Sequence, residues 1–255
     1  MIKKVVVAVA GTGTRMLDLA KDKPKHLIHV LDRPFLAYLL DNLFYAGYSD
    51  IILVVGYKGE MIEEFKSSYV PPIKGDFKLE AISQYDLLGT KEQGTYGTAC
   101  PLMCVKDSIH ESFIFLYGDN LYSVKDLKAL DVNDDYNYVA GMHHDAPEKY
   151  GVLISDDNGF LKEIIEKPKK FVGNIINTGP FKFTPEVFEK LPLIQKSERG
   201  EYEITDVISL LAKEKKVKVK TIEDYWIDFG KPEDVEKLAE FIKHGNLKGI
   251  GKSAR

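Results

Sequence analysis

Cysteine is scarce in this chain, with only Cys100 and Cys104 among 255 residues. The two thiols are one helical turn apart in an apolar stretch, and no second Cys/His set has the spacing of metal ligands, so helical packing is expected rather than a disulfide or a metal pair. Basic residues form no stripe, and the net charge is −4. No nucleic-acid partner is expected, because binding to a phosphate backbone needs a basic footprint.

Long hydrophobic runs are also missing. No apolar run reaches about 18 residues, the length that suggests a membrane span, and residues 1–4 lead into a strand pattern without the apolar region and cleavage site of a signal peptide. We therefore expect a soluble cytoplasmic protein without a membrane partner. With 44% hydrophobic residues, the chain can bury the core of one large α/β domain, alone or with an elaboration.

Strand and helix patterns alternate through the first half. Strands are expected at 5–10, 51–55, 79–82 and 113–117, and helices near 35–44, 61–65 and 97–105. Apolar strands that alternate with helices predict a mostly parallel sheet covered on both faces. Ligands of such sheets bind beyond the carboxyl ends of the strands.

The second half is less regular. We expect a hairpin at 151–155 and 160–165, a strand at 175–183, helices at 185–190 and 204–213, an edge strand at 217–220, a last helix at 232–244 and a mobile tail at 245–255.

A glycine loop, Gly11-Thr12-Gly13-Thr14-Arg15, follows the first strand, and Pro24-Lys25 comes shortly after. Glycines let backbone N–H groups approach a polyphosphate, and an arginine can grip phosphoryl oxygens with two parallel bonds. The loop therefore predicts phosphate binding, with a solvated turn as the alternative. Met16 stands where a dinucleotide fingerprint needs its third glycine, and no Gly-Lys-Ser/Thr of a P-loop is present.

Two carboxylates follow apolar strands. Asp119 comes after the strand 113–117 and a glycine, and Asp228 ends the apolar segment 225–227. Together they could hold one Mg²⁺ over phosphates, since this ion prefers oxygen ligands. A turn or a helix cap is the plainer alternative for Asp119. Glu166-Lys167 closes the hairpin, either as a charged strand end or as a contact to a sugar phosphate, whereas His26 and His29 are expected to pack or lie at the surface.

Taken together, the motifs of this chain resemble the sugar-1-phosphate nucleotidylyltransferases, and most closely the glucose-1-phosphate thymidylyltransferases. The motifs that carry the resemblance are Gly11–Arg15 with Pro24-Lys25, Gly118-Asp119-Asn120, Lys149–Val152, Glu166-Lys167-Pro168, Asn177-Thr178-Gly179, Arg199–Asp206 and Trp226–Gly230.

The resemblance implies an α/β, Rossmann-like fold of the nucleotide-diphospho-sugar transferase type, a mostly parallel mixed sheet with a smaller sugar-binding β elaboration. One nucleotidyltransferase domain would span 1–244, with a nucleotide-binding part at about 1–135 and a sugar-binding part at about 136–230. Such an enzyme joins a nucleoside triphosphate to a sugar 1-phosphate and releases pyrophosphate.

The resemblance also implies roles for single residues. The nucleotide and its triphosphate would be held by Ala10, Gly11, Thr12, Gly13, Thr14 and Gly97. Arg15 and Lys25 would stabilise charge at the reacting phosphorus, and Asp119 and Asp228 would hold Mg²⁺. The sugar would contact Gly151, Glu166, Asn177 and Glu201, and its phosphate would contact Lys167. In-line substitution at phosphorus needs positioning and cations but no protein nucleophile, which agrees with this set.

Two neighbours compete to read the base. A glutamine amide both donates and accepts, which matches uracil or thymine, whereas a carboxylate only accepts, which matches the donors of guanine. Gln93 therefore predicts dTTP or UTP, with glucose 1-phosphate, and is favoured. Glu92 predicts GTP, with mannose 1-phosphate.

Two positions depart from the family. Val9 stands where a small residue is usual and could press on the base or ribose, and Lys231 replaces a hydroxyl residue. What remains after residue 244 cannot hold a left-handed β-helix, so acetyltransferase activity is not expected. A catalytically silent nucleotide-sugar-binding protein is a rival that the retained charged residues oppose. The sequence leaves the oligomeric state open, a homo-oligomer included.

Overall fold

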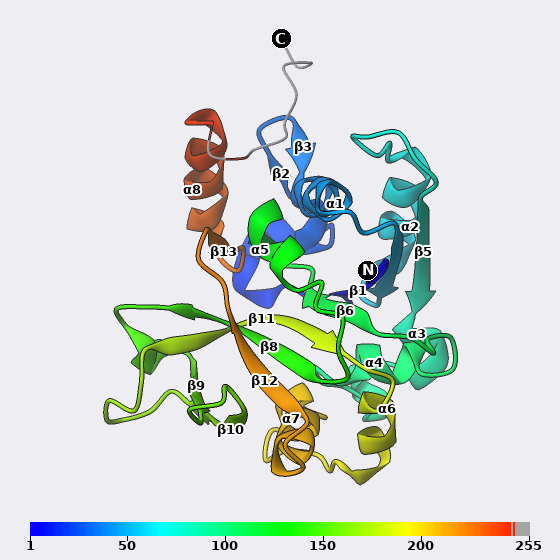
Figure 1. Cartoon of the computed structure of the whole chain (residues 1–255). Coiled ribbons are helices and arrows are strands. Elements are labelled where there is room, and N and C mark those ends of the chain that lie inside the picture. Colours follow the sequence, from blue (N-terminus) through cyan, green and yellow to red (C-terminus); the bar gives the residue numbers. More distant parts are fainter. Residues whose placement is uncertain (246, 248–255) are drawn as a thin grey trace. The chain divides into compact units, whose positions relative to one another are not determined.

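The chain folds into two compact units, seen here in a computed structural model that describes residues 1–245 and 247 (Figure 1). Unit 1 consists of Met1–Ile2, Gln84–Leu116 and Leu130–Glu223. Unit 2 consists of Lys3–Ser83, Tyr117–Ala129 and the described residues from Asp224 onwards. Apart from residues 245 and 247, the predicted tail lies outside the described residues.

Unit 2 is built on three parallel strands, β1 (Lys4–Val9), β4 (Asp50–Val55) and β5 (Lys78–Ser83). β1 and β4 are apolar and almost wholly buried, as expected for parallel strands covered on both faces. The other elements of this unit are α1 (Phe35–Ala46), α2 (Gly59–Ser68), α5 (Val124–Ala129), α8 (Pro232–Lys243) and the antiparallel pairs β2 (His29–Val30) with β3 (Arg33–Pro34) and β7 (Asn120–Tyr122) with β13 (Trp226–Asp228).

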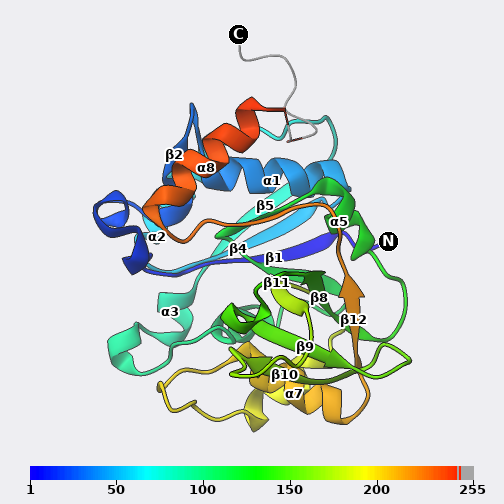
Figure 2. The same ribbon diagram turned by 90° about the vertical axis from the view of Figure 1, so that its left-hand side faces the viewer.

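Helix α1 is buried along most of its length and lies along one face of the parallel strands (Figure 2). It packs against α5 and β7, and its Asn42 donates a hydrogen bond of 2.8 Å to the carbonyl oxygen of Tyr122. Because β7 continues directly from Asp119, this contact helps to fix the position of that carboxylate.

Unit 1 contains the antiparallel part of the fold. Strand β11 (Ile175–Phe183) pairs antiparallel with β6 (Phe113–Tyr117), β8 (Asn137–His143) and β9 (Gly151–Ser155), β9 pairs antiparallel with β10 (Leu161–Glu166), and β12 (Val217–Thr221) pairs parallel with β8. The helices of this unit are α3 (Gln84–Leu88), α4 (Cys100–Val105), α6 (Val187–Lys190) and α7 (Ile204–Lys213).

The predicted fold class is confirmed, since a parallel α/β part is combined with an antiparallel elaboration. The helix predicted near 97–105 begins later, at Cys100, because Gly97 is held in a loop. Both thiols are free, and burial raises the pKa of Cys100 to about 11 and that of Cys104 to about 12. Strand β8 was not predicted, because Gly141 interrupts its short apolar run.

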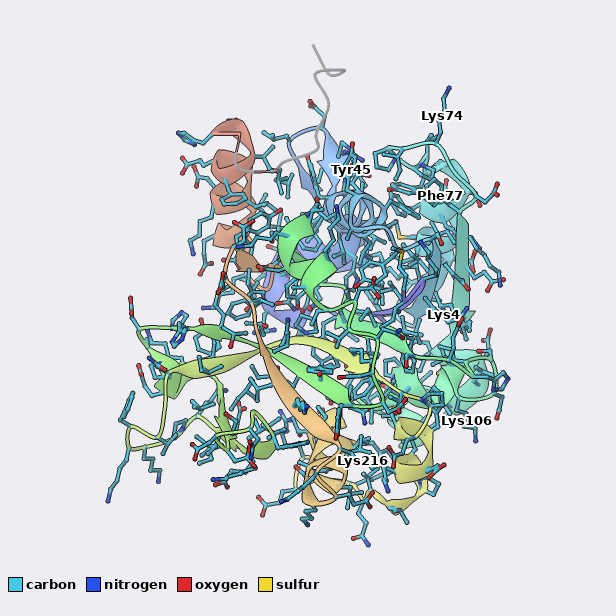
Figure 3. All side chains as sticks on the ribbon, viewed as in Figure 1. Lys4, Tyr45, Lys74, Phe77, Lys106 and Lys216 are labelled. Carbon is cyan, nitrogen blue, oxygen red and sulfur yellow. The ribbon has the colours of Figure 1, made fainter. Side chains whose placement is uncertain are left out.

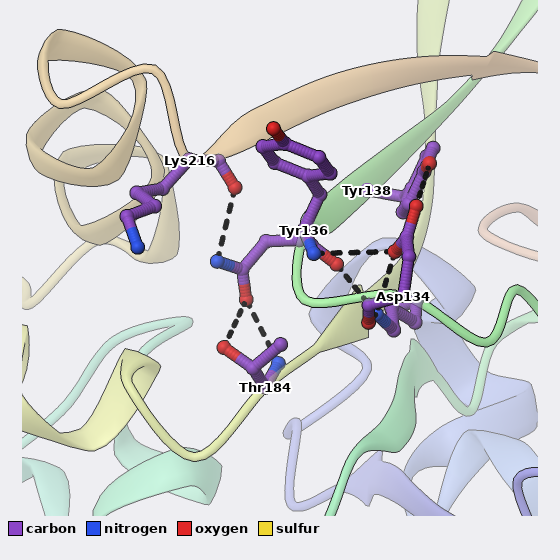
Figure 4. A network of polar contacts seen from close by, with 7 residues as sticks. Asp134, Tyr136, Tyr138, Thr184 and Lys216 are labelled. Carbon is purple, nitrogen blue, oxygen red and sulfur yellow. Dashed lines mark hydrogen bonds and ion pairs between the residues drawn. The ribbon is translucent and has the colours of Figure 1, made fainter.

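A polar network ties β8 to β11 in unit 1 (Figure 4). The Lys182 side chain is fully buried and donates to the carbonyl oxygen of Tyr136 at 2.6 Å and to Asp134. Burial lowers the pKa of Lys182, and Asp134 counteracts that shift. Tyr138 donates to the same carboxylate at 2.6 Å. The buried charge is therefore both paired and hydrogen-bonded, as burial of a charge requires.

An exposed apolar loop joins α2 to β5 in unit 2. Val70 is 79% exposed, and Lys74 points away from the ribbon (Figure 3). Phe77 anchors the end of the loop by packing edge-on against Phe44, with ring centroids 4.6 Å apart. In the part of the chain described here, no helix is long and apolar enough to cross a membrane.

Candidate functional site

The glycine loop lies at the carboxyl end of β1 in unit 2. Gly13 has a φ of 66°, and a Cβ atom there would come within 3.1 Å of Cβ of Lys25. A larger residue is therefore disfavoured by both backbone conformation and space. Thr14 and Arg15 are exposed at the start of a short 3₁₀ helix, Thr14–Ala20. The loop thus brings backbone groups, an arginine and a lysine together.

Lys25 forms an ion pair and hydrogen bond with Asp119. Burial acts to raise the pKa of Asp119, but the charge and hydrogen bond of Lys25 outweigh it and lower the pKa. The neighbouring His26 is buried, as expected for a packed histidine, and burial lowers its pKa to about 3. Asp119 is therefore an ionised carboxylate beside a neutral imidazole.

Asp228 lies beside Asp119 because β13 pairs with β7. The backbone N–H of Phe229 donates to the carbonyl oxygen of Asp119 at 2.8 Å. Partial desolvation and the charge of Asp119 raise the pKa of Asp228, while Arg15 acts in the opposite direction. The guanidinium of Arg15 lies over Gly230, with Nη2 3.4 Å from the place a Cβ would take. Arg15 and the two aspartates thus form one charged group.

Two neighbouring carboxylates, Asp228 on β13 and Asp119 just before the paired strand β7, suit a divalent cation. Mg²⁺ usually takes one or two protein carboxylates and completes its shell with water and substrate phosphates. Desolvation and, after it, repulsion from Asp119 raise the pKa of Asp228, and a bound cation would offset the repulsion. The described residues contain no group of three or more His, Cys, Asp or Glu side chains that could hold a metal, but a site completed by phosphates does not need one. Asp119 and Asp228 therefore fit Mg²⁺.

The structure shows where both departures from the family lie. Val9 is fully buried, and its Cγ1 lies 2.4 Å from the position of a Cβ on Gly118. The expectation that Val9 presses on a base or ribose is wrong, because the side chain fills the core. Lys231 precedes α8, where Asp234 accepts its backbone N–H at 2.8 Å. This contact is the half of a capping box that the third helical residue supplies, while Lys231 has no side-chain acceptor to supply the other half. Ala10 is also buried and packs against Gly56.

Three of the predicted sugar residues come together in unit 1. A Cβ on Gly151 would lie 3.0 Å from Oε2 of Glu166 and 3.9 Å from Cβ of Asn177. β9 supplies the glycine, β10 ends at the glutamate, and β11 carries the asparagine. The pairing of β9 with both other strands explains the cluster.

The amide of Asn177 is fixed by a bulge in β11. The pairing with β8 changes register between Asn177 and Phe181, and the backbone N–H of Gly179 donates to Oδ1 of Asn177 at 3.0 Å. Thr178 is buried and donates to the carbonyl oxygen of Ala140 at 3.2 Å. Because Oδ1 of Asn177 already accepts the N–H of Gly179, the NH₂ group of Asn177 is the part of the amide that can donate to a ligand.

Lys167 lies beside this cluster, whereas Glu201 pairs with Lys91 next to the base-reading segment. Lys167 is mostly exposed and has its Nζ 3.7 Å from Oε1 of Glu166, so its charge is accessible to a ligand. Glu201 is less exposed, with Oε1 3.9 Å from Nζ of Lys91. A cavity of about 490 Å³, lined by residues of 144–148 and 168–174, contains none of the predicted site residues.

The base-reading segment forms a short turn. Oε1 of Gln93 accepts the backbone N–H of Thr90 at 2.6 Å, so its NH₂ group is the part available to a ligand. Glu92 is exposed, and a hydrogen bond from Thr90 lowers its pKa. Gly97 has a φ of 137°, and a Cβ there would come within 2.2 Å of the carbonyl oxygen of Tyr202. Close packing of two backbones explains the glycine.

Sequence reasoning missed the residues that support these loops. Thr98, Arg199 and Glu203 form a hydrogen-bonded group in unit 1. They were missed because such residue types are common in turns and at helix starts. The role of Gln93 as a cap could have been found, because Thr90-x-x-Gln93 has the spacing of a capping box.

Comparison with known proteins agrees with this geometry. The family model described as nucleotidyl transferase matches residues 4–245. The chain is 33% identical to a UTP–glucose-1-phosphate uridylyltransferase of Haloferax volcanii, over 94% of this chain and 96% of that protein. It is 32% identical to a bifunctional sugar-1-phosphate nucleotidylyltransferase/acetyltransferase of Sulfurisphaera tokodaii, over 90% of this chain but only 53% of that protein.

Solved structures share the fold. An apo UDP-glucose pyrophosphorylase matches with a TM-score of 0.81 and 22% identity, over 97% of this chain and 100% of that one. The chain belongs to the nucleotidyl transferase family, and its resemblance to the sugar-1-phosphate nucleotidylyltransferases is confirmed.

Proposed function

We propose that this protein transfers a nucleotidyl group from UTP or dTTP to glucose 1-phosphate, giving a nucleoside diphosphate glucose and pyrophosphate. The observation that carries the proposal is the charged group of unit 2, in which Arg15 and Lys25 adjoin Asp119 and Asp228. The uridylyltransferase of Haloferax volcanii supports the choice of nucleotide and sugar.

The chemistry asked of these residues is positioning and charge stabilisation. A phosphate oxygen of the sugar 1-phosphate attacks the α-phosphorus of the triphosphate, the bond from that phosphorus to the bridging oxygen breaks, and pyrophosphate leaves with the electron pair. The Gly11–Thr14 backbone and Arg15 would hold the triphosphate, and Lys25 would add charge beside the reacting phosphorus. Asp119 and Asp228 would hold Mg²⁺, which would supply further neutralisation of phosphate charge.

In unit 1, the donor face of Asn177 and the acceptor oxygens of Glu166 would bind sugar hydroxyls. A pyrophosphate-release screen tests the proposed substrates. UTP, dTTP, GTP, ATP and CTP are each paired with glucose, galactose and mannose 1-phosphates at fixed Mg²⁺. We expect the highest kcat/KM for glucose 1-phosphate with UTP or dTTP.

Replacement of Lys167 tests the site of the sugar phosphate. Lys167→Ala is expected to raise KM for glucose 1-phosphate by about ten- to a hundredfold, as for loss of one charge-assisted hydrogen bond, with a smaller effect on KM for the triphosphate. Steady-state kinetics with each substrate varied in turn measure both values. Lys162→Ala, which removes an exposed lysine from β10, is the control. A rise confined to KM for the triphosphate would reverse the assignment.

Replacement of Gln93 tests how the base is read. Gln93→Glu keeps an oxygen that can accept the N–H of Thr90 but removes the donor, so kcat/KM with UTP or dTTP should fall about tenfold or more. Glu92→Gln is the matched control and should change little. A preference for GTP with mannose 1-phosphate that is abolished by Glu92→Gln would show that Glu92 reads the base.

A further inference from the structure

Glu203 is a buried carboxylate, only 9% exposed, at the junction of two loops in unit 1. Its Oε1 accepts hydrogen bonds from Oγ of Ser197 at 3.1 Å and from Nη2 of Arg199 at 2.8 Å. Its Oε2 accepts one from Oγ1 of Thr98 at 3.1 Å. The first two donors belong to the loop that carries Glu201, and the third belongs to the loop that follows Gln93.

The hydroxyl of Thr98 extends this link into a helix. Oγ1 of Thr98 accepts the backbone N–H of Ile204, the first residue of α7, at 2.9 Å. It thus acts on the amino end of α7 as a cap supplied from a distant part of the chain. Thr98 and Glu203 are 105 positions apart, so this hydrogen bond joins two segments that are distant in the sequence.

The backbones of the two loops are joined as well. The N–H of Ala99 donates to the carbonyl oxygen of Tyr202 at 2.9 Å, and the N–H of Tyr202 donates to the carbonyl oxygen of Tyr96 at 2.8 Å. Gly97 lies between these bonds and permits the close approach. The side chain of Glu203 adds hydrogen bonds to both loops at the same place. If either loop moved away, a buried carboxylate oxygen of Glu203 would lose its hydrogen-bond donors, which is unfavourable.

We propose that Glu203 is a positioning residue that holds residues 94–99 and 196–202 in one arrangement, so that damage to either loop weakens binding of both substrates. The inference rests on the proposed function and on the family resemblance, which assigns the first loop to the nucleotide through Gly97 and the second to the sugar through Glu201. Arg199 supports the link, since its pKa is raised by the hydrogen bond to Glu203 and also by the charges of Glu201 and Glu166.

The test is whether a substitution in one loop raises KM for the substrate assigned to the other loop. Thr98→Val removes the hydroxyl from the base-side loop and should raise KM for glucose 1-phosphate by about tenfold, in addition to KM for UTP. Arg199→Gln replaces the guanidinium that donates to Glu203 and should raise KM for UTP as well as for the sugar phosphate. Thr98→Ser keeps the hydroxyl and should restore both values, and Thr205→Val, the same change on α7, is the control.

Hydrogen exchange gives a readout that does not depend on turnover. In Glu203→Gln, which keeps the shape but removes the charge, peptides covering 94–99 and 196–202 should both exchange faster than in the parent protein, with the strand β6 unchanged. Faster exchange in both loops together with the crossed KM effects supports the coupling. A KM change only for the substrate of the mutated loop, or faster exchange in only one of the two loops, overturns it. If the parent protein transfers no nucleotidyl group at all, the proposed function fails, while exchange still decides the coupling.

Discussion

Replacing Asp228 by asparagine is expected to lower turnover by about a hundredfold or more, the scale of losing one transition-state stabiliser. The change keeps the size of the side chain but removes a charge that a hard divalent cation requires. Asp119 should behave in the same way, because it directly precedes the strand that pairs with β13 and its charge acts on Asp228. Initial rates of pyrophosphate release across a range of Mg²⁺ concentrations measure the effect.

The control is Asp224→Asn, an exposed carboxylate four positions earlier on the same segment. It should leave both turnover and the Mg²⁺ dependence unchanged. If the Asp228→Asn protein instead kept near-normal activity with an unaltered Mg²⁺ optimum, the carboxylate pair would not be the metal site.

Replacing Arg15 by lysine should lower kcat by about tenfold or more, although the charge is preserved. A lysine ammonium cannot reproduce the two parallel hydrogen bonds of a guanidinium, so charge developing on the phosphoryl oxygens is met less well. Arg15→Ala should lower kcat further. The comparison of kcat with KM for UTP shows whether the loss arises in the transition state or in substrate binding.

Lys21→Ala removes an exposed cation near the same loop and serves as the control. An Arg15→Lys protein with unchanged kcat and a raised KM for UTP would mean that Arg15 only binds the triphosphate.

Local patterns predicted the charged group of unit 2 well. Asp119 follows the apolar strand β6 and Asp228 ends β13, so the sequence could place both carboxylates at strand ends. The antiparallel pairing of β13 with β7 brings them together. The glycine loop with Lys25 could be predicted for the same reason, since Gly13 and Lys25 do lie in contact. Periodicity likewise predicted α1 and α7, whose apolar faces repeat regularly.

Packing against distant segments decided what local patterns could not. Val9 was expected beside a ligand, yet Gly118 receives it in the core. Nothing in the sequence near Glu203 shows that Thr98 is its partner, because 105 positions separate them. A resemblance to a family transfers the residues that touch substrates more readily than those that hold the loops in place.

The measurement that tests the central proposal most directly follows the α-phosphorus itself. The protein is incubated with UTP labelled at the α-phosphorus, with glucose 1-phosphate and Mg²⁺, and the products are separated. Nucleotidyl transfer predicts label in UDP-glucose, formed in equal amount with pyrophosphate and only when the sugar phosphate is present. Label that remains in UTP, or that appears in UMP without any sugar nucleotide, would contradict the proposal.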